Sequence, residues 1–190
     1  GKELFIGGVR TPLEQWSPWR LEEKHDELFK IAGLQNISRQ LAHLLNPRTI
    51  LDILQYYTVY ATSNQREKIK VICRYQQYEG ANAIVERVLE GRIKKGLIWH
   101  FQGSGKSLLM LFAAQKLRKL KELGSPTVLI VVDRVDLDTQ ITATFNTAEV
   151  PNMVTTDDIK ALHDLLEQDT RKIIITMIHK FKDAYTDMNK

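Results

Sequence analysis

The sequence lacks the features that stabilise small secreted domains or anchor proteins in membranes. It has one cysteine, Cys73, which cannot form an intramolecular disulfide, and no group of Cys and His residues has zinc-site spacing. The longest unbroken aliphatic run, Val128 to Val132, is far shorter than the roughly 20 residues that span a bilayer. The first residues lack the apolar centre of a secretory signal. These absences predict a soluble protein of a reducing, cytoplasmic compartment without membrane partners.

Glycine and proline are also scarce, with ten and five among 190 residues, which excludes a collagen-like or low-complexity chain. Charged residues make up 26% of the chain and hydrophobic residues 43%. This balance excludes a disordered chain and is typical of one globular domain, with room for a small appendage.

The net charge of +4 is unevenly distributed along the chain. Residues 61–123 contain thirteen basic and five acidic side chains, whereas residues 124–190 contain seven basic and eleven acidic ones. A middle third this basic indicates an anionic partner, either a nucleotide or a nucleic acid. The same charges also suit the solvated face of a helix. The residues that would form such a face are Lys116, Arg118, Lys119 and Lys121.

The first 60 residues are expected to form a small helical extension. Ser17-Pro18 offers an N-cap and a first-turn proline for a helix that ends at Gly33. Two further short helices are expected to begin near Asn36 and at Asn46-Pro47. Nothing in this part requires chemistry, so we interpret it as a packing extension or linker that leads into the remainder, residues 61–190, and its packing partner stays open.

From residue 61 onward, predicted strands alternate with predicted helices. The strands are expected at residues 68–72, 96–100, 127–132 and 172–177, and the helices at residues 75–89, 105–123, 136–145 and after Thr156. Residues 127–132 form a continuous aliphatic run of the kind that parallel sheets bury on both faces. This order predicts an α/β fold, in which helices flank a doubly wound parallel sheet.

The sharpest motif is a glycine-rich loop between a predicted strand and a predicted helix. Its residues are Gly103, Ser104, Gly105, Lys106 and Ser107. Glycines let consecutive backbone N–H groups turn toward phosphate oxygens, and the helix N-terminus adds a favourable dipole. The lysine would reach the β- and γ-phosphates of a nucleotide, and the serine hydroxyl that follows it would ligate Mg²⁺. The loop therefore predicts a P-loop, with its lysine and final serine as the catalytic pair.

Two glutamines upstream of the loop are candidates for reading adenine. The amide of Gln76 or Gln77 offers an acceptor and two donors, which match the adenine N6 and N7 positions. We favour Gln77, because it stands three residues after Arg74 and just before an amphipathic helix. The alternative is an exposed, polar helix start.

Polar residues also follow two of the predicted strands. Asp133, Arg134 and Gln140 come after one strand, and Thr176 and Lys180 come at the end of another. Ligands bind at the carboxyl edge of parallel sheets, so these residues are candidates for a binding surface. Ordinary turn and cap chemistry is the alternative interpretation.

Three segments together resemble the motor subunits of type I restriction-modification enzymes, members of helicase superfamily 2. They are IWHFQGSGKS (98–107), VVDRVDLDTQ (131–140) and IIITMIHKF (173–181), which look like successive helicase motifs. The stretch DRVDLDTQ is unusually specific. His100 replaces the first glycine of the usual loop pattern, and this family tends to carry histidine there. The resemblance covers roughly residues 34–183.

This resemblance implies an incomplete RecA-like P-loop lobe, in which ATP-driven translocation of double-stranded DNA is coupled to cleavage far from the recognition site. It implies that residues 103–107 hold ATP and Mg²⁺, with Gln77 and Arg74 at the adenine. It also implies methyltransferase and specificity subunits as partners, and contacts with the DNA backbone that carry no sequence information. The residues expected to make these contacts are Arg134, Gln140, Thr176 and Lys180.

Several parts that such an enzyme requires are not recognisable in these 190 residues. We find no Asp-Glu-Ala-His-like motif, no second motor lobe and no nuclease constellation. We therefore expect a fragment of an ATP-dependent type I endonuclease subunit that does not hydrolyse ATP by itself.

Three other functions remain open from the sequence. The chain could be a standalone P-loop kinase or NTPase with His163, His179 or Asp133 as a base, another superfamily 2 helicase, or a structural interaction module. Nucleotide binding separates the interaction module from the others, and phosphate transfer to an acceptor identifies a kinase.

Overall fold

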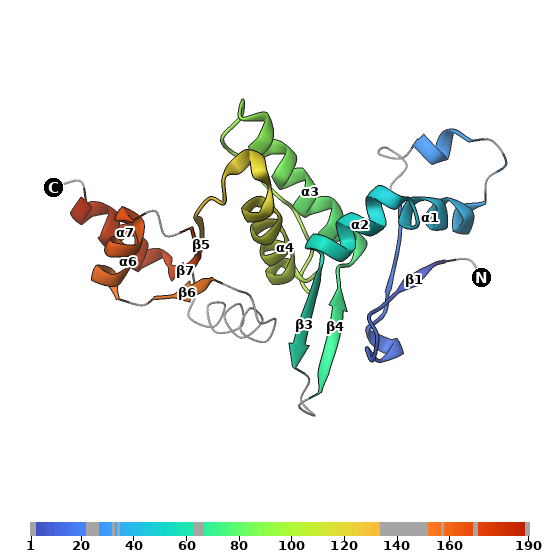
Figure 1. The fold of residues 1–190 in the computed structure, drawn as a ribbon, viewed down its shortest axis with the longest axis horizontal. Helices are drawn as coiled ribbons and strands as arrows, with labels where there is room; N and C mark the ends of the chain where they lie inside the picture. Colours follow the sequence, from blue (N-terminus) through green and yellow to red (C-terminus); the bar gives the residue numbers. More distant parts are fainter. Residues whose placement is uncertain are drawn as a thin grey trace.

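The computed structural model describes residues 3–21, 27–31, 33, 35–62, 67–133, 152–156, 158–168 and 171–188. The α-helices are α1 (Asn36–Leu44), α2 (Pro47–Tyr56), α3 (Tyr75–Glu90), α4 (Lys106–Lys119), α6 (Ile159–Glu167) and α7 (Ile178–Met188). The strands are β1 (Phe5–Ile6), β2 (Ser17–Pro18), β3 (Thr58–Thr62), β4 (Lys68–Ile72), β5 (Val128–Val132), β6 (Met153–Thr155) and β7 (Ile173–Met177). Short 3₁₀ helices are η1 (Leu13–Gln15), η3 (Glu27–Lys30) and η4 (Lys121–Leu123). Figure 1 shows α3 and α4 at the centre of the molecule.

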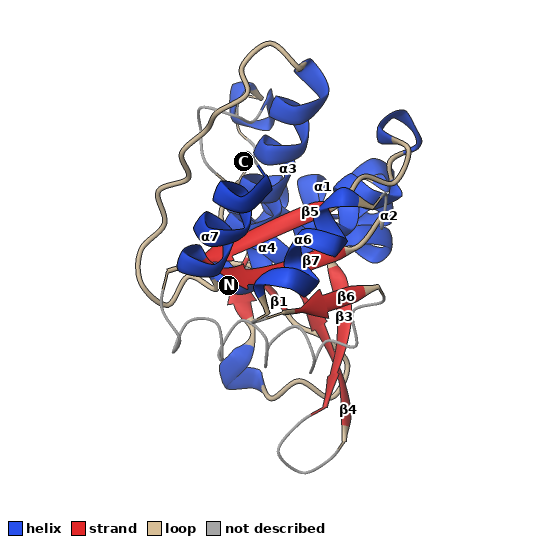
Figure 2. Cartoon of the chain, turned by 90° about the vertical axis from the view of Figure 1, so that its left-hand side faces the viewer, coloured by secondary structure: helices blue, strands red, loops and turns tan. Residues whose placement is uncertain are grey.

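A parallel sheet of order β5-β7-β6 forms one end of the described structure. β7 pairs with β5 along its whole length and with β6 over three residues, so it is the central strand, and all five of its residues are buried. Ile174 packs with Leu162 of α6, whereas Ile173 and Ile175 belong to the main core with residues of α4. Figure 2 shows α6 and α7 beside this sheet. Helices therefore cover both faces, as in a partial RecA-like lobe.

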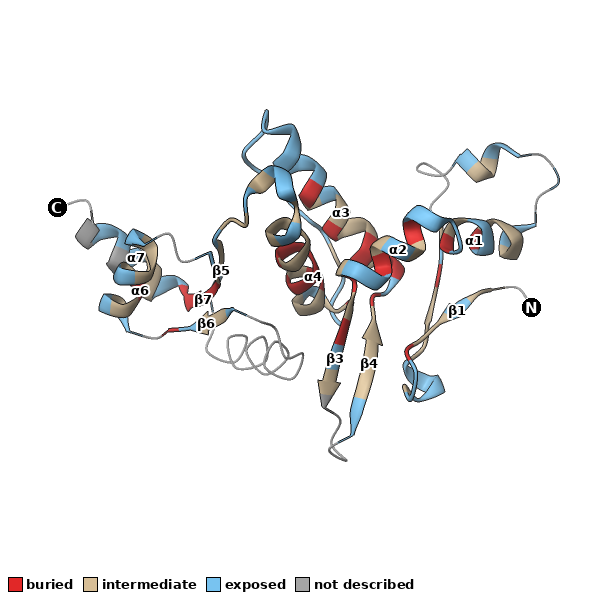
Figure 3. Cartoon of the chain, in the orientation of Figure 1, coloured by how far each residue is buried: buried red, intermediate tan, exposed pale blue. Residues whose placement is uncertain are grey.

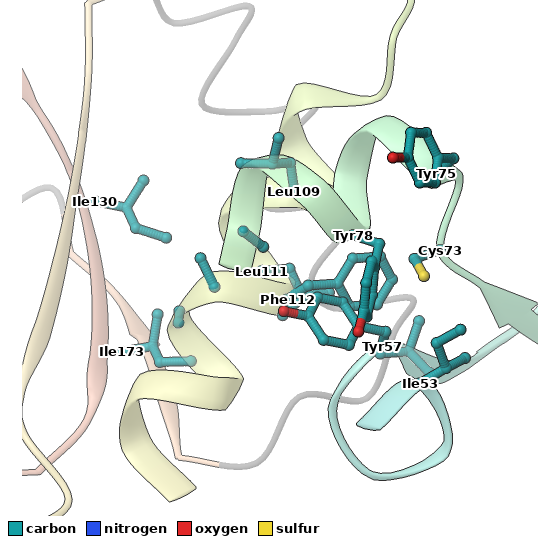
Figure 4. Close-up of a cluster of buried hydrophobic side chains, with 14 of the residues drawn as sticks. Ile53, Tyr57, Cys73, Tyr75, Tyr78, Leu109, Leu111, Phe112, Ile130 and Ile173 are labelled. Atoms are coloured by element: carbon teal, nitrogen blue, oxygen red, sulfur yellow. The ribbon is translucent and has the colours of Figure 1, made fainter. Parts of the chain in front are cut away.

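The main core lies between α3, α4 and the elements that precede them. Phe112 of α4 packs on Tyr57, which in turn packs on Tyr78 of α3, as the close-up in Figure 4 shows. Trp19 is fully buried in the same core, although it lies far upstream in the sequence. Burial raises the pKa of the Cys73 thiol well above its ordinary value, with a further contribution from the Asp52 charge. Figure 3 shows buried residues on α2, α3 and α4 and along β7.

Most of the predicted helices and strands are confirmed. α3 ends at Gly91, whose left-handed backbone (φ 66°) suits a helix C-terminus. α2 begins at Pro47, directly after its N-cap residue Asn46. The Asn46 side chain accepts a hydrogen bond from the backbone N–H of Arg48. α6 is capped by Asp158 rather than Thr156. The helix expected at residues 136–145 lies outside the described residues.

The strand predicted at residues 96–100 is wrong. The segment has no regular secondary structure and pairs with none of the described strands. Leu97 and Trp99 are 88% and 89% exposed, so one side of the segment faces solvent. An apolar alternation predicts extended backbone, whereas a strand also needs a hydrogen-bonded neighbour, which a local sequence pattern cannot supply.

The helix predicted after Ser17-Pro18 does not begin there, because these two residues form β2 and pair with β1. Residues 22–26 of the predicted helix lie outside the described residues, and residues 27–30 form the 3₁₀ helix η3. The backbone N–H of Trp19 donates to the carbonyl of Leu4 at 2.8 Å, and the indole N–H donates to Nδ1 of His43 at 3.2 Å. Burial of the indole holds the chain extended here and overrides the local helix signal.

The expectation of a purely helical extension needs a second correction. β3 and β4 form an antiparallel hairpin in which Thr58 pairs with Ile72 and Thr62 with Lys68. The strand at residues 68–72 is therefore confirmed, but its partner comes from the segment assigned to the extension. The hairpin crosses residue 60, and the division of the chain into residues 1–60 and 61–190 stays a prediction.

Truncating the centre of the core tests this packing. Phe112→Ala should lower the free energy of unfolding by about 3–5 kcal/mol, because it leaves a cavity between α3, α4 and Tyr57. Leu51→Ala, at an exposed position of α2, is the control and should change it by less than about 0.5 kcal/mol. Urea unfolding followed by circular dichroism measures both. Equal effects would contradict the core described above.

Candidate nucleotide-binding site

The glycine-rich loop turns directly into the N-terminus of α4. Gly103 and Gly105 both have a φ of 81°, in the left-handed region that favours glycine, and Gly105 is the N-cap of the helix. Lys106 and Ser107 are the first two residues of α4. The two motif glycines therefore allow a backbone conformation that other residues adopt only with strain.

The amine of Lys106 lies over the start of this loop. Its Nζ donates to the carbonyls of Phe101 at 2.9 Å and His100 at 3.3 Å, and the side chain is exposed. The cation thus sits at the positive end of α4, where two backbone carbonyls stabilise it. A phosphate at this helix end would find both the cation and unpaired backbone N–H groups.

The structure brings Gln77 and Arg74 to the same loop. Oε1 of Gln77 accepts from the backbone N–H of Arg74 at 2.8 Å, and its Nε2 donates to the carbonyl of Gly105 at 2.9 Å. The guanidinium of Arg74 donates to the carbonyl of Gly103 at 3.3 Å. Gln77 is only 2% exposed. Its amide therefore holds the loop in place, and adenine recognition stays a prediction.

A cavity of about 670 Å³ joins the loop to the carboxyl end of β5. Its walls combine polar groups of the loop with apolar side chains of α3, α4 and β5. The lining residues are Ile84, Ile98, Gln102, Gly103, Gly105, Lys106, Ser107, Leu109, Met110, Val131, Val132 and Asp133. Asp133, a candidate from the sequence, reaches this cavity. Ile84 was not predicted as a site residue, because its helical spacing indicates core packing and no motif marks it.

The residues at the cavity fit a nucleoside triphosphate with Mg²⁺. Lys106 and Ser107 supply a cation and a hydroxyl from the first turn of α4, and both line the cavity. The Oγ of Ser104 is buried without a hydrogen-bond partner among the described groups. A buried hydroxyl usually has a partner, so an unpaired one in a phosphate-type loop is consistent with a site that a ligand completes.

Thr176 does not have the position predicted for it. It is 1% exposed, and its hydroxyl donates to the carbonyl of Thr156 at 3.3 Å. The hydroxyl therefore links β7 to the end of β6 and faces no solvent, so it contacts no DNA backbone in this arrangement. Lys180 is half-buried in the first turn of α7. Arg134 and Gln140 lie outside the described residues.

The alternative catalytic bases are not gathered at the cavity. The imidazole of His163 lies 3.5 Å from the carboxylate of Glu167 on the surface of α6, and His179 is exposed on α7. Neither lines the cavity, whereas Asp133 does.

Within the described residues, no helix is long and apolar enough to cross a membrane.

Comparison with known proteins identifies the class to which this fold and loop belong. The model of the SWI2/SNF2 ATPase family matches residues 76–190, more than half of the chain, and the chain belongs to this family. It is also similar to the endonuclease subunits of type I restriction enzymes, and we conclude that it is homologous to a segment of such subunits.

Three of these relatives define the extent of the similarity. The HindI endonuclease subunit of Haemophilus influenzae is 31% identical over 187 residues, which are 93% of this chain and 18% of the relative. Two putative type I subunits of Methanocaldococcus jannaschii also match. MjaVIIP is 36% identical over 64% of this chain and 11% of its own length. MjaIXP is 28% identical over 95% of this chain and 19% of its own length. The chain thus spans less than a fifth of the length of these relatives.

The two left-handed glycines provide a test of the loop geometry. A Cβ at Gly105 would lie 2.3 Å from Nε2 of Gln77, whereas a Cβ at Gly103 would meet nothing within 4 Å. Gly103→Ala should therefore cost only the strain of positive φ, about 1–2 kcal/mol. Gly105→Ala should cost about 1–3 kcal/mol more, because it also displaces the buried Gln77 amide. Urea unfolding of both variants measures the difference, and equal costs would exclude the Gln77 contact.

Proposed function

We propose that this chain is the ATP-binding part of the DNA-translocating motor of a type I restriction endonuclease subunit. The observation that carries the proposal is the GSGKS loop at the N-terminus of α4, which opens into the cavity that Asp133 also lines. Family membership supports nucleotide use, and similarity to restriction subunits supports the enzyme class. Translocation of double-stranded DNA and remote cleavage, together with methyltransferase and specificity partners, are proposed for the whole polypeptide.

Each loop residue has a specific task in this proposal. The backbone N–H groups of the loop and the amine of Lys106 would bind phosphate oxygens, and the hydroxyl of Ser107 would ligate Mg²⁺. Ser104 would gain a partner for its buried hydroxyl. Mg²⁺, when bound, neutralises charge that develops on the phosphates. The Gln77 amide holds the loop against α3. Gln77 and Arg74 would also contact the adenine base.

Hydrolysis by these 190 residues is not expected. The sequence contains no Asp-Glu-Ala-His-like motif that would hold Mg²⁺ and position the attacking water. A standalone kinase is less well supported, because His163 and His179, two of its three candidate bases, do not line the described cavity. The remaining candidate base, Asp133, lines the cavity and is compatible with both a kinase and a motor ATPase.

Removal of the loop lysine tests nucleotide binding. Lys106→Ala should weaken Mg·ATP binding by about tenfold to a hundredfold, because it removes a charged hydrogen-bond donor to phosphate. Lys121→Ala, beyond the end of α4, removes an equal charge from an exposed site and is the matched control. Calorimetric titration measures the affinities, and phosphate release measures hydrolysis. An unaffected Lys106→Ala variant, or clear hydrolysis by the 190-residue chain, would refute the proposal.

DNA binding by the chain should be weak and independent of sequence. The basic surplus around the loop helix and Lys180 supports contact with the phosphate backbone, so affinity should fall steeply with salt. Lys180→Ala should reduce the slope of log affinity against log salt by about 0.9, the contribution of one phosphate contact. Lys182→Ala, on the exposed side of α7, is the control. Binding assays with two unrelated duplexes measure this, and tight, sequence-selective binding at high salt would contradict it.

A further inference from the structure

Three helices meet at one charged side chain in the interior of the structure. Nζ of Lys116 in α4 donates to both carboxylate oxygens of Asp52 in α2, each at 2.7 Å, and to Oδ1 of Asn82 in α3 at 2.7 Å. The hydroxyl of Tyr57 donates to the same amide oxygen at 2.6 Å. We call Asp52, Asn82 and Lys116 the three-helix clamp.

The clamp is shielded from water. The side chains of Lys116 and Asp52 are 12% and 16% exposed, whereas the Lys30–Glu27 ion pair is largely exposed. Nζ of Lys116 also lies 5.2 Å from the ring centre of Tyr57 and 5.3 Å from that of Tyr56. Charges with this little exposure interact more strongly than surface charges, and their hydrogen bonds fix the directions of the elements that carry them.

The neighbouring tyrosines respond to this environment. Burial, with a contribution from the Asp52 charge, raises the pKa of Tyr78 to about 12. The same causes raise the pKa of Tyr57 well above its ordinary value. Both hydroxyls therefore remain protonated at neutral pH and can act as donors beside the Asp52 carboxylate.

The clamp lies on the same helix as the phosphate loop. α4 begins at Lys106 and continues without interruption past Lys116, so the two lysines belong to one rigid element. At the start of this helix, Gln77 of α3 holds the carbonyl of Gly105. Further along, Asn82 of α3 holds Lys116. α3 therefore fixes α4 at two points, and Asp52 ties α2 to the second of them.

We propose that Asp52 and Lys116 are positioning residues for the phosphate loop. They set the position of α4 against α2 and α3, and through α4 they set the placement of Gly105, Lys106 and Ser107. They also couple α2, in the segment before the hairpin, to the nucleotide site. The effect on nucleotide affinity rests on the proposed function, whereas the effect on loop order does not.

An ion pair suits this task better than apolar packing would. Replacing a buried ion pair by apolar groups is often neutral or stabilising, so the pair is not needed for stability alone. Its hydrogen bonds, however, have a preferred geometry that favours one register between the three helices, whereas apolar contacts are non-directional. Stability and loop placement should therefore respond differently to its replacement.

This difference defines the experiment. We would prepare Asp52→Leu, Lys116→Met and the double variant, which replaces both charges by apolar side chains, with Lys119→Met as the control. Lys119 also connects α4 to α2, but through an exposed contact with the carbonyl of Gln55. Three quantities are measured for each: the urea midpoint, amide hydrogen exchange over residues 101–112, and Mg·ADP affinity by calorimetry where the protein is fully folded.

The single variants should lower the urea midpoint, because each leaves a charge unpaired in the interior. The double variant should recover the midpoint, yet show about tenfold faster exchange in the loop and about tenfold weaker Mg·ADP binding, in the range of coupling through packed networks. The Lys119→Met control should match the wild type in all three. Because the double variant removes both charges, it keeps the test valid even if the single variants fail to fold.

The outcomes separate the two proposals. If the double variant recovers loop exchange together with the midpoint, the clamp is merely structural and the positioning role is overturned. If the wild type binds no Mg·ADP, the proposed function fails, but the exchange measurement still decides the role of the clamp. If the wild type binds and the double variant binds equally well, the positioning role is overturned while the proposed function stands.

Discussion

The buried amide of Gln77 is the contact on which the rest of the candidate site depends. It closes the N-terminus of α3 through the backbone of Arg74 and holds the carbonyl of Gly105 at the other side. The Gln77 side chain is 2% exposed and uses both amide atoms, so contacts within the chain itself hold the loop against α3. A site that is ordered in advance loses less conformational entropy when it binds.

Sequence reasoning predicted the individual helices and strands around the loop better than the way in which they pair. The loop, α3, α4, β5 and β7 follow from glycine spacing and from local apolar periods, which depend on residues close together in the chain. Pairing cannot be deduced in this way, because the neighbour of a strand is set by distant residues. Residues 96–100 and the buried Trp19 show the consequence. The segment 96–100 has no described strand partner, whereas Trp19 contacts residues far away in the sequence.

The basic face expected on the last turns of α4 shows a similar limit. Lys116 pairs with Asp52 in the interior, and Arg118 donates to the carbonyl of Arg171 at 2.6 Å. Composition alone cannot separate a buried lysine from a solvated one, because the deciding carboxylate lies on another helix. Thr176 illustrates the reverse case. A polar residue at the end of a parallel strand indicates the edge of the sheet where ligands bind. The Thr176 hydroxyl instead donates a hydrogen bond within the sheet region, to the carbonyl of Thr156.

The position of β7 has a consequence for how the chain folds during synthesis. β5 and β6 both pair with β7 and not with each other, although both precede it in sequence. Neither strand can complete its hydrogen bonds in this sheet until residues 173–177 have left the ribosome. The β3–β4 hairpin and the α3–α4 pair are closer in sequence and can form earlier, since closing a short loop costs less entropy. A nascent chain would therefore carry two unpaired strands in this interval, and unpaired strand edges favour aggregation.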